Sequence, residues 1–392
     1  MTLAKRRSVA DLIAMRQLRA ILTVSVLLGV AACTTTGSTP GVGERLPEPE
    51  SVLENPGLLS DQARLGRHVA LSAEVRAVAD AETAEVAERA LQVAFDAADS
   101  VARLVTLNLE GSELWAINEA AGDHPVPVSP WTERIVLATV RWADRTGGAF
   151  EPTIGPLAGL WGFGVQVDRA PTPEEIHAAL SNVGFSKIEI DVDAHTIFLP
   201  DEGMRLDVRG AAKGFALDRM REAMLDAGAT AGIIDFAGEM LFFGPGPQNG
   251  MWPIQLKDPY DPSRNYAYLL LPAGSLATSS FYDRSVEIRG QRYGHVIDPR
   301  TGQPTAGMAS VTVYANEGVV ADIVATGLFV VSCADGPRCT EAAGIVNRYP
   351  ELNAIIVPEP PPGDNAQVTV TSGMRPYVIR LQRPFRPAAE PD

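Results

Sequence analysis

The sequence predicts an α+β fold in which mixed sheets are covered by packed helices. The 392 residues are 46% hydrophobic and 21% charged, a composition typical of a globular protein with a sizeable core. Helical and strand patterns interleave along residues 64–381, but without the regular strand–helix–strand alternation of a parallel sheet. The sequence shows no internal repeat, so we expect one folded unit rather than an array.

The helices are predicted from apolar residues at helical spacing and from residues that favour helix starts. Thr172-Pro173-Glu174-Glu175 is a typical helix start, with a capping hydroxyl followed by proline and acidic residues. Val319–Ser332 is apolar on nearly all sides, which predicts a buried helix. The five predicted helices are Glu82–Leu104, Pro130–Arg145, Pro173–Asn182, Ala211–Ala227 and Val319–Ser332.

The strands are predicted from short runs of β-branched and aromatic residues between turn residues. Ile188–Leu199 is predicted to be a hairpin, because two apolar segments flank the polar sequence Asp-Val-Asp-Ala-His. Arg205–Val208 is predicted to be a strand that leads into the helix beginning at Ala211. The other predicted strands are Ile233–Phe243, Tyr266–Leu271, Arg284–Ile288 and Ala309–Ala315.

Charge and cysteine content exclude several classes of protein. The formal net charge of −15 excludes a nucleic-acid-binding protein, because binding to nucleic-acid phosphates needs clustered Lys and Arg. Three cysteines are too few for a disulfide scaffold or a cysteine-rich zinc module. Cys333 and Cys339 are near enough in sequence to pair in an oxidising compartment, with two free thiols as the alternative.

Residues 1–32 are predicted to be a signal peptide. Basic residues precede the apolar run Ala20–Ala32, which is too short to span a bilayer but fits a secretory signal. The end of this run, Val30-Ala31-Ala32-Cys33, resembles the lipobox of bacterial lipoproteins, which implies that Cys33 carries a lipid anchor. An ordinary signal peptide with an incidental cysteine is the alternative.

The chain has four predicted parts, of which the signal peptide is the first. Residues 33–60 are rich in Gly, Pro, Ser and Thr and are expected to form a flexible tether after the lipidated Cys33. The folded domain is expected over residues 61–382, and residues 383–392 are expected to be a flexible tail. An acidic folded domain does not bind an anionic membrane by charge, so the lipid on Cys33 would hold the protein at the membrane.

Two segments in the middle of the chain are candidates for ligand binding. Gly147–Gly164 is a long segment rich in glycine and proline, and such loops are often functional, although a structural loop is the alternative. Leu206–Asp218 places Lys213 near a predicted helix start, where free N–H groups and the lysine could bind a phosphate. It lacks the Walker A pattern, and a plain strand-to-helix turn is the alternative.

Two later segments carry further chemistry. His295 lies beside a turn that contains Asp, Arg and Thr, so it could act as a general base or bind phosphate; an exposed loop histidine is the alternative. Asp322 and Thr326 are four residues apart and would share a helix face, where their oxygens suit Mg²⁺ rather than zinc. A carboxylate in this apolar helix is costly without a partner, although Asp322 could instead cap the helix.

Taken in order, these segments resemble the ApbE-like flavin transferases, which are FAD:protein FMN transferases. The resemblance spans roughly residues 64–381 and is carried by an ordered set of motifs. The matching stretches are Glu151–Gly164, Asp207–Gly214, Ala277–Ser280, His295–Pro304 and Ala321–Thr326, with Ser112-Glu113-Leu114 and Asn118 before them.

The resemblance implies an ApbE-like fold and a Mg²⁺-dependent transfer of FMN from FAD to a threonine hydroxyl of an acceptor protein, with release of AMP. It implies that His295 and Asp322 are catalytic, with His295 taking the threonine proton. The implied metal ligands are Gly210, Asp322 and Thr326, and the implied FAD-site residues are Glu151, Pro152, Thr153, Asp207, Lys213 and Val296.

The sequence departs from the family pattern at several positions. Leu65-Gly66-Arg67 stands where the family has Met-Gly-Thr, and a tyrosine expected shortly before Ser112 is absent, with Asn108 or Leu109 nearby. Arg209 and Ser280 replace glycines, and Ala237-Gly238-Glu239 replaces Gly-Gly-Asp. These departures leave two alternatives: a Mg²⁺-dependent FAD pyrophosphatase that yields FMN and AMP, or an FAD-binding lipoprotein without turnover.

The same interpretation predicts where the protein acts and on what. We expect it to be lipid-anchored to a bacterial membrane and to face the periplasm. The expected partners are FAD and a flavinylated redox protein, or a membrane redox-complex subunit, that exposes a threonine on the same side.

Overall fold

The computed structural model describes residues 51–162, 169–280, 285–288, 291–331, 339–360 and 367–381. The predicted signal peptide, Cys33 and the predicted C-terminal tail therefore lie outside the described residues. The predicted tether ends too late, because Val52 and Leu53 are only 3% and 4% exposed and pack in a hydrophobic cluster. This apolar pair anchors the residues before Ser60 to the folded domain.

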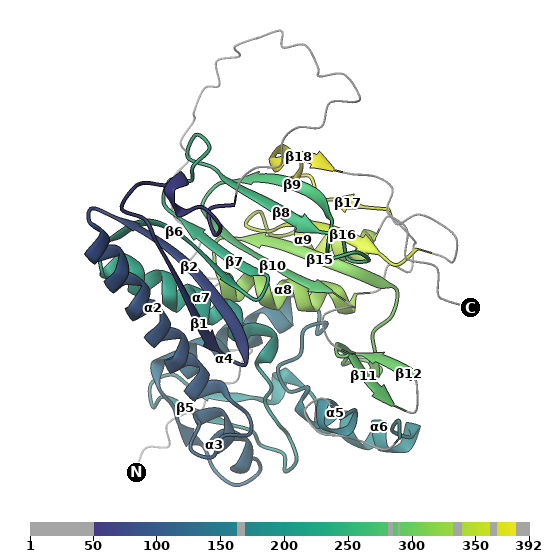
Figure 1. The fold of residues 1–392 in the computed structure, drawn as a ribbon. Helices are drawn as coiled ribbons and strands as arrows, with labels where there is room; N and C mark the ends of the chain where they lie inside the picture. The colour runs from purple at the N-terminus through teal and green to yellow at the C-terminus, as the bar shows by residue number, and fades with distance from the viewer. Residues whose placement is uncertain are drawn as a thin grey trace, which may run out of the picture.

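An antiparallel sheet of eight strands forms the centre of the described chain (Figure 1). Neighbouring strands pair in the order β1-β2-β6-β7-β10-β15-β16-β17. Sequence-distant segments thus lie side by side in it. The strands are β1 (Arg64–Ala70), β2 (Ala73–Ala81), β6 (Ala229–Phe236), β7 (Glu239–Phe243), β10 (Gly274–Ser280), β15 (Met308–Ala315), β16 (Asn353–Pro358) and β17 (Thr369–Val370).

Helices cover one face of this sheet (Figure 1). The helices α2 (Ala84–Val105), α7 (Arg209–Asp226) and α8 (Gly318–Val330) contact the strands, and α4 (Pro130–Arg145) packs on α7 and α8. Five of the nine buried residues of α2 are alanines, so the neighbouring elements can approach this helix closely. These contacts form the largest hydrophobic cluster of the described residues.

A small sheet covers the other face of the central sheet. Its strands are β18 (Val378–Leu381), β9 (Asn265–Leu271) and β8 (Trp252–Lys257), in that order. Because side chains alternate along a strand, Leu241 and Phe243 pack with the helices, whereas Phe242 packs with Trp252 of the small sheet. The middle strands of the central sheet are therefore buried on both faces, and only the helical face leads to the site described below.

The remaining elements surround the helical layer. Trp161 follows α5 and donates from Nε1 to the Gly302 carbonyl at 2.8 Å, in a cluster with Ile176 and Ile297. These elements are α3 (Glu113–Glu119), β3 (Val126–Pro127), α5 (Gly155–Leu160), α6 (Pro173–Leu180), η2 (Phe185–Lys187), β4 (Glu189–Asp191), β5 (Thr196–Phe198), β11 (Ser285–Ile288), β12 (Gln291–Gly294), β13 (Ile297–Asp298), β14 (Gln303–Pro304) and α9 (Thr340–Asn347), with η1 (Pro56–Leu58) and η4 (Arg375–Tyr377) near the ends.

The α+β class is confirmed, and the predicted helices correspond to α2, α4, α6, α7 and α8. The strand predicted at Arg205–Val208 is wrong. Its backbone bonds to non-strand partners, because the Asn118 amide bonds both N–H and C=O of Leu206 and Asp207 N–H donates to the Pro152 carbonyl. The strand predicted at Ile233–Phe243 is two strands, β6 and β7, joined by Ala237 and Gly238 at φ +51° and +93°.

Cys339 is disulfide-bonded, so the alternative of a free thiol at this position is wrong. Cys333, its predicted partner, lies outside the described residues. No helix in the described part of the chain is both long and apolar enough to cross a membrane.

Candidate active site

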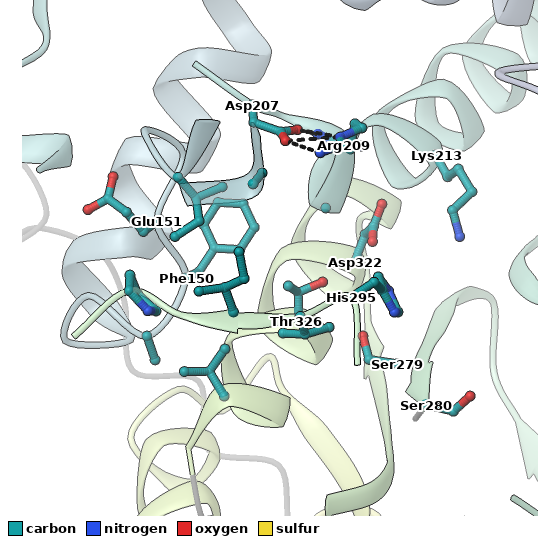
Figure 2. Close-up of a pocket in the computed structure, with 18 of the residues that line it drawn as sticks. Phe150, Glu151, Asp207, Arg209, Lys213, Ser279, Ser280, His295, Asp322 and Thr326 are labelled. Atoms are coloured by element: carbon teal, nitrogen blue, oxygen red, sulfur yellow. Dashed lines mark hydrogen bonds and ion pairs between the residues drawn. The ribbon is translucent and has the colours of Figure 1, made fainter. Parts of the chain in front are cut away.

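The predicted site residues gather around one cavity of about 470 Å³ on the helical side of the central sheet (Figure 2). They come from segments that are far apart in the sequence, and the ends of α7 and α8 bring them together. The lining residues that the sequence singled out are Glu151, Asp207, Gly210, Lys213, His295, Val296, Asp322 and Thr326.

Asp322 lies in the second turn of α8 and is 4% exposed. The helix begins at Gly318 after Glu317, so Asp322 does not cap it, and that alternative is wrong. Its Oδ2 accepts a hydrogen bond from the Gly214 N–H of α7 at 2.9 Å. Burial raises the pKa of Asp322 well above its ordinary value, and the nearby Glu239 carboxylate raises it further.

The crossing of α7 and α8 places this carboxylate. A Cβ at Gly214 would lie 2.2 Å from the Gly318 carbonyl oxygen, and one at Gly318 would lie 2.4 Å from that of Gly214. Two glycines therefore let the backbones touch. Asp218 of α7 completes the contact, because its carboxylate accepts from the N–H groups of Gly318 and Val319 at 2.8 and 2.9 Å. This carboxylate caps α8 from a neighbouring helix.

Asp322 and two neighbouring oxygen donors, the Gly210 carbonyl and the Thr326 hydroxyl, fit a hard cation. Gly210 departs from helical geometry at φ −79° and ψ 15°, and a Cβ on it would lie 3.3 Å from Thr326 Oγ1. The Gly210 backbone and the Thr326 hydroxyl are thus neighbours, and Thr326 is one turn after Asp322. Among the described residues no three His, Cys, Asp or Glu side chains form a metal cluster. The fit therefore depends on mixed carboxylate, hydroxyl and carbonyl oxygens, which suit Mg²⁺.

Each permanent cation in the described lining of the cavity faces a carboxylate. Lys213 Nζ forms a salt bridge with Glu239 Oε1. The Arg209 guanidinium forms a salt bridge with Asp207, with Nε at 2.9 Å from both carboxylate oxygens. Glu239 Oε2 is buried and has no hydrogen-bond partner among the described residues. Together with Asp322, there are three carboxylates for these two cations. A bound diphosphate would therefore require an additional cation.

A buried, hydrogen-bonded segment lies beside the cavity and consists of Glu151, Pro152 and Thr153. Glu151 Oε1 accepts from the backbone and hydroxyl of Thr153 at 2.8 and 2.6 Å, and Oε2 accepts from Phe185 N–H at 3.0 Å. Burial raises the pKa of Glu151, although these hydrogen bonds oppose the shift. Only Glu151 of the three lines the cavity; Pro152 and Thr153 lie behind it and hold the adjoining loops.

His295 and Val296 lie between β12 and β13 and line the same cavity as Asp322. Figure 2 labels His295 and Asp322 among the residues of this cavity. The Val296 carbonyl accepts from Thr305 N–H at 2.8 Å and from its hydroxyl at 3.2 Å. These bonds tie the segment to the β13–β14 hairpin. His295 is half-buried, so the alternative of an exposed loop histidine is wrong.

A second cavity of about 710 Å³ adjoins the first, and the sequence interpretation missed it. Leu71 and Ser72 form one wall at the β1–β2 turn, where both have positive φ without the glycine or asparagine that marks such turns. No sequence pattern therefore marks Leu71 and Ser72 as turn residues that line a cavity. Asn108, near the position of the missing family tyrosine, lines this cavity. Leu65 lines neither cavity and is 37% exposed on β1.

The comparisons with known proteins identify the family of this chain. The family model described as the ApbE family matches residues 68–348. A FAD:protein FMN transferase of Treponema pallidum is 29% identical over 318 residues, covering 73% of this chain and 88% of that protein. One from Klebsiella pneumoniae is 32% identical over 235 residues, covering 59% and 72%.

Solved structures show the same fold. The ApbE protein from Thermotoga maritima superposes with a TM-score of 0.71 at 29% identity, covering 80% of this chain and 99% of that one. The flavin transferase ApbE from Vibrio cholerae gives 0.68 at 22% identity over 80% and 99%, which supports the fold alone. By sequence model, relatives and fold together, this chain belongs to the ApbE family.

Proposed function

We propose that this protein transfers FMN from FAD to a threonine hydroxyl of an acceptor protein and releases AMP, with Mg²⁺ bound at the site. The observation that carries the proposal is the single cavity in which Asp322, Thr326, Gly210, Lys213 and His295 meet. The curated relatives named FAD:protein FMN transferase support the reaction class.

The geometry is suited to an attack on phosphorus. The acceptor hydroxyl oxygen forms a bond to the FMN phosphorus while the bond from that phosphorus to the AMP oxygen breaks. His295 takes the hydroxyl proton, and AMP leaves with the electron pair of the broken bond. Lys213 lies one turn after Arg209 on α7, where its ammonium group pairs with Glu239 and would add positive charge beside the bound phosphates.

The metal would be held by the Asp322 carboxylate, the Thr326 hydroxyl and the Gly210 carbonyl. A bound Mg²⁺ supplies positive charge to the phosphate oxygens. The protein side of this arrangement is preorganised, because Gly214 N–H fixes one oxygen of Asp322 and the glycine contact fixes α8 against α7. The unpartnered Glu239 Oε2 adds negative charge that favours a cation here.

The same proposal includes a location and a class of acceptor. The lipobox-like sequence ending at Cys33 supports a lipid anchor on a bacterial membrane, facing the periplasm. An enzyme held there reaches acceptors on the same face. We propose a redox protein or membrane redox-complex subunit with an exposed threonine as the acceptor.

The test measures AMP and protein-bound flavin separately. The chain is incubated with FAD and Mg²⁺, with a candidate acceptor or a version of it whose threonine is replaced by valine, and with a chelator control. AMP release that requires the threonine, together with flavin fluorescence that stays on the denatured acceptor, is the expected result.

The same experiment distinguishes the alternatives. Equal AMP and free FMN with and without acceptor would make the protein an FAD pyrophosphatase. Stoichiometric FAD that remains intact in Mg²⁺ with any acceptor would make it a binding protein. Unchanged turnover in the presence of chelator would remove the metal from the proposal.

A further inference from the structure

Arg209 lies where the two cavities meet. The cavities share the lining residues Ala158, Asp207, Arg209 and Lys213, of which Arg209 and Lys213 are the cations. These two residues are four apart on α7, so they lie on the same side of the helix. A ligand that occupies both cavities must therefore pass these two side chains.

The Arg209 side chain is held in one orientation. Its Nε and Nη2 bond to the Asp207 carboxylate, and its backbone N–H donates to Asp207 Oδ1 at 3.0 Å. The Asp207 side chain is 5% exposed, whereas that of Arg209 is 47% exposed. Within the described residues, Arg209 Nη1 makes no hydrogen bond. The guanidinium thus keeps a fixed, unused donor edge where the cavities join.

That edge suits a phosphate that bridges the cavities. A guanidinium plane matches two phosphate oxygens at once, whereas an ammonium group acts as a single point charge. The pairing with Asp207 cancels the net charge of Arg209 but leaves the Nη1 donors. A molecule with a flat group at each end and a diphosphate between them would place its link beside these donors.

We propose that Arg209 determines the nucleotide specificity of this chain by hydrogen bonding to the diphosphate link of FAD where it passes between the two cavities. The inference rests on the proposed function, because it takes FAD as the ligand. It adds a specificity residue at a position where the family pattern has glycine, and it predicts that this chain selects diphosphates over monophosphates through that residue.

The test compares the full chain with Arg209→Gln and Arg209→Lys by isothermal titration calorimetry in Mg²⁺. ADP is the diphosphate probe, AMP the monophosphate, riboflavin the flavin without phosphate, and FAD the substrate. We expect Arg209→Gln to weaken ADP and FAD binding by about tenfold or more, to reduce the preference for ADP over AMP, and to leave riboflavin binding unchanged. Arg209→Lys should give an intermediate loss, because it keeps the charge without the planar edge.

Arg300→Gln is the matched control. Arg300 forms the same kind of salt bridge with the aspartate two residues before it, Asp298. Its Nε and Nη2 lie 2.8 and 2.9 Å from the two carboxylate oxygens, and 45% of its side chain is exposed. It lines neither cavity. This variant should bind all four probes as the unmodified chain does, and thermal unfolding checks that each variant is folded.

The outcomes separate this inference from the proposed function. If the unmodified chain binds FAD and ADP but both Arg209 variants keep the same ADP-to-AMP preference, the specificity role is wrong and the proposed function stands. Tighter FAD binding by Arg209→Gln would show that the side chain obstructs the passage, which also overturns the role. If the unmodified chain binds neither FAD nor ADP, both proposals fail. If Arg209→Gln does not fold, Arg209→Lys decides between the first two outcomes.

Discussion

The two faces of the central sheet bury very different side chains. On the helical face, α7, α8 and β7 bury three carboxylates, those of Asp218, Glu239 and Asp322. On the opposite face, the small sheet packs aromatic and aliphatic side chains such as Trp252 against Phe242. The helical face thus adds buried carboxylates to the largest hydrophobic cluster, whereas Trp252 and Phe242 on the opposite face contact aromatic and aliphatic side chains.

This difference shows which contacts stabilise the fold and which serve the site. Burial of apolar area stabilises a protein, whereas a buried carboxylate costs free energy unless hydrogen bonds or a cation compensate. Asp218 is compensated by two N–H groups of α8. Asp322 has the Gly214 N–H and a neighbouring carboxylate. Replacing a carboxylate of the helical face should therefore change activity, and truncating an apolar side chain of the opposite face should change stability alone.

The largest expected effect is on activity, from Asp322→Asn. Loss of the carboxylate ligand should lower Mg²⁺-dependent AMP release by roughly 10⁴-fold, or about 5 kcal/mol in the barrier. The free energy of unfolding without metal should not fall by more than about 1 kcal/mol, because the amide oxygen still accepts from Gly214 and the buried charge is gone. Initial rates and urea unfolding in chelator measure both. A variant that keeps its activity would contradict the assignment of Asp322.

The opposite pattern is expected for Trp252→Ala on the small sheet. Trp252 is fully buried against Phe242, and its removal should cost about 3–5 kcal/mol of unfolding free energy. The rate per folded molecule should not change, because the side chain lies on the far side of the sheet from the cavity. Urea unfolding with rates corrected for the folded fraction tests this. A comparable loss in the corrected rate would show that the two faces are coupled.

A change at the helix crossing should affect both properties. The Gly214→Ala methyl would lie 2.2 Å from the Gly318 oxygen, so α8 must shift, at a cost of about 1–3 kcal/mol. The same shift displaces Asp322 and should reduce the rate. Gly344→Ala in α9 is the control, because nothing lies within 4 Å of its added methyl, and it should stabilise by up to about 1 kcal/mol. Equal behaviour of the two variants would refute the tight crossing.

The last expected effect is a pH-dependent stabilisation by Mg²⁺, which is small at Mg²⁺ concentrations near Kd. Because the folded pKa of Asp322 is raised, its protonation stabilises the metal-free protein at low pH, and this contribution is lost as pH rises from the ordinary aspartate range toward the folded pKa. Mg²⁺ needs the carboxylate, so its stabilising effect should grow with pH and reach about 2.7 kcal/mol at a concentration of 100 Kd.

Thermal unfolding of the unmodified chain between pH 5 and pH 8, with and without Mg²⁺, measures this effect. Asp322→Asn should show little stabilisation by Mg²⁺ at any pH in this range. Stabilisation that decreased with pH in the unmodified chain would contradict the assigned direction.

Local patterns in the sequence predicted the helices well, because their information is short-range. The proline at the first position of α4 and the capping box of α6 define where these helices begin. The strand at Arg205–Val208 was mispredicted for the opposite reason. Its partners are Asn118 and Pro152, which are far away in the sequence, so no local pattern distinguishes it from a strand.

The site shows the same division. The sequence by itself determined which residue types carry the chemistry: a carboxylate in an apolar helix at Asp322, a hydroxyl one turn later at Thr326 and a lysine near a helix start at Lys213. Only the tertiary structure decided that Glu239 pairs with Lys213, that Asp218 caps α8, and that two cavities meet at Arg209. Helix spacing follows from the chain alone, whereas the packing of α7 on α8 depends on the whole sheet beneath them.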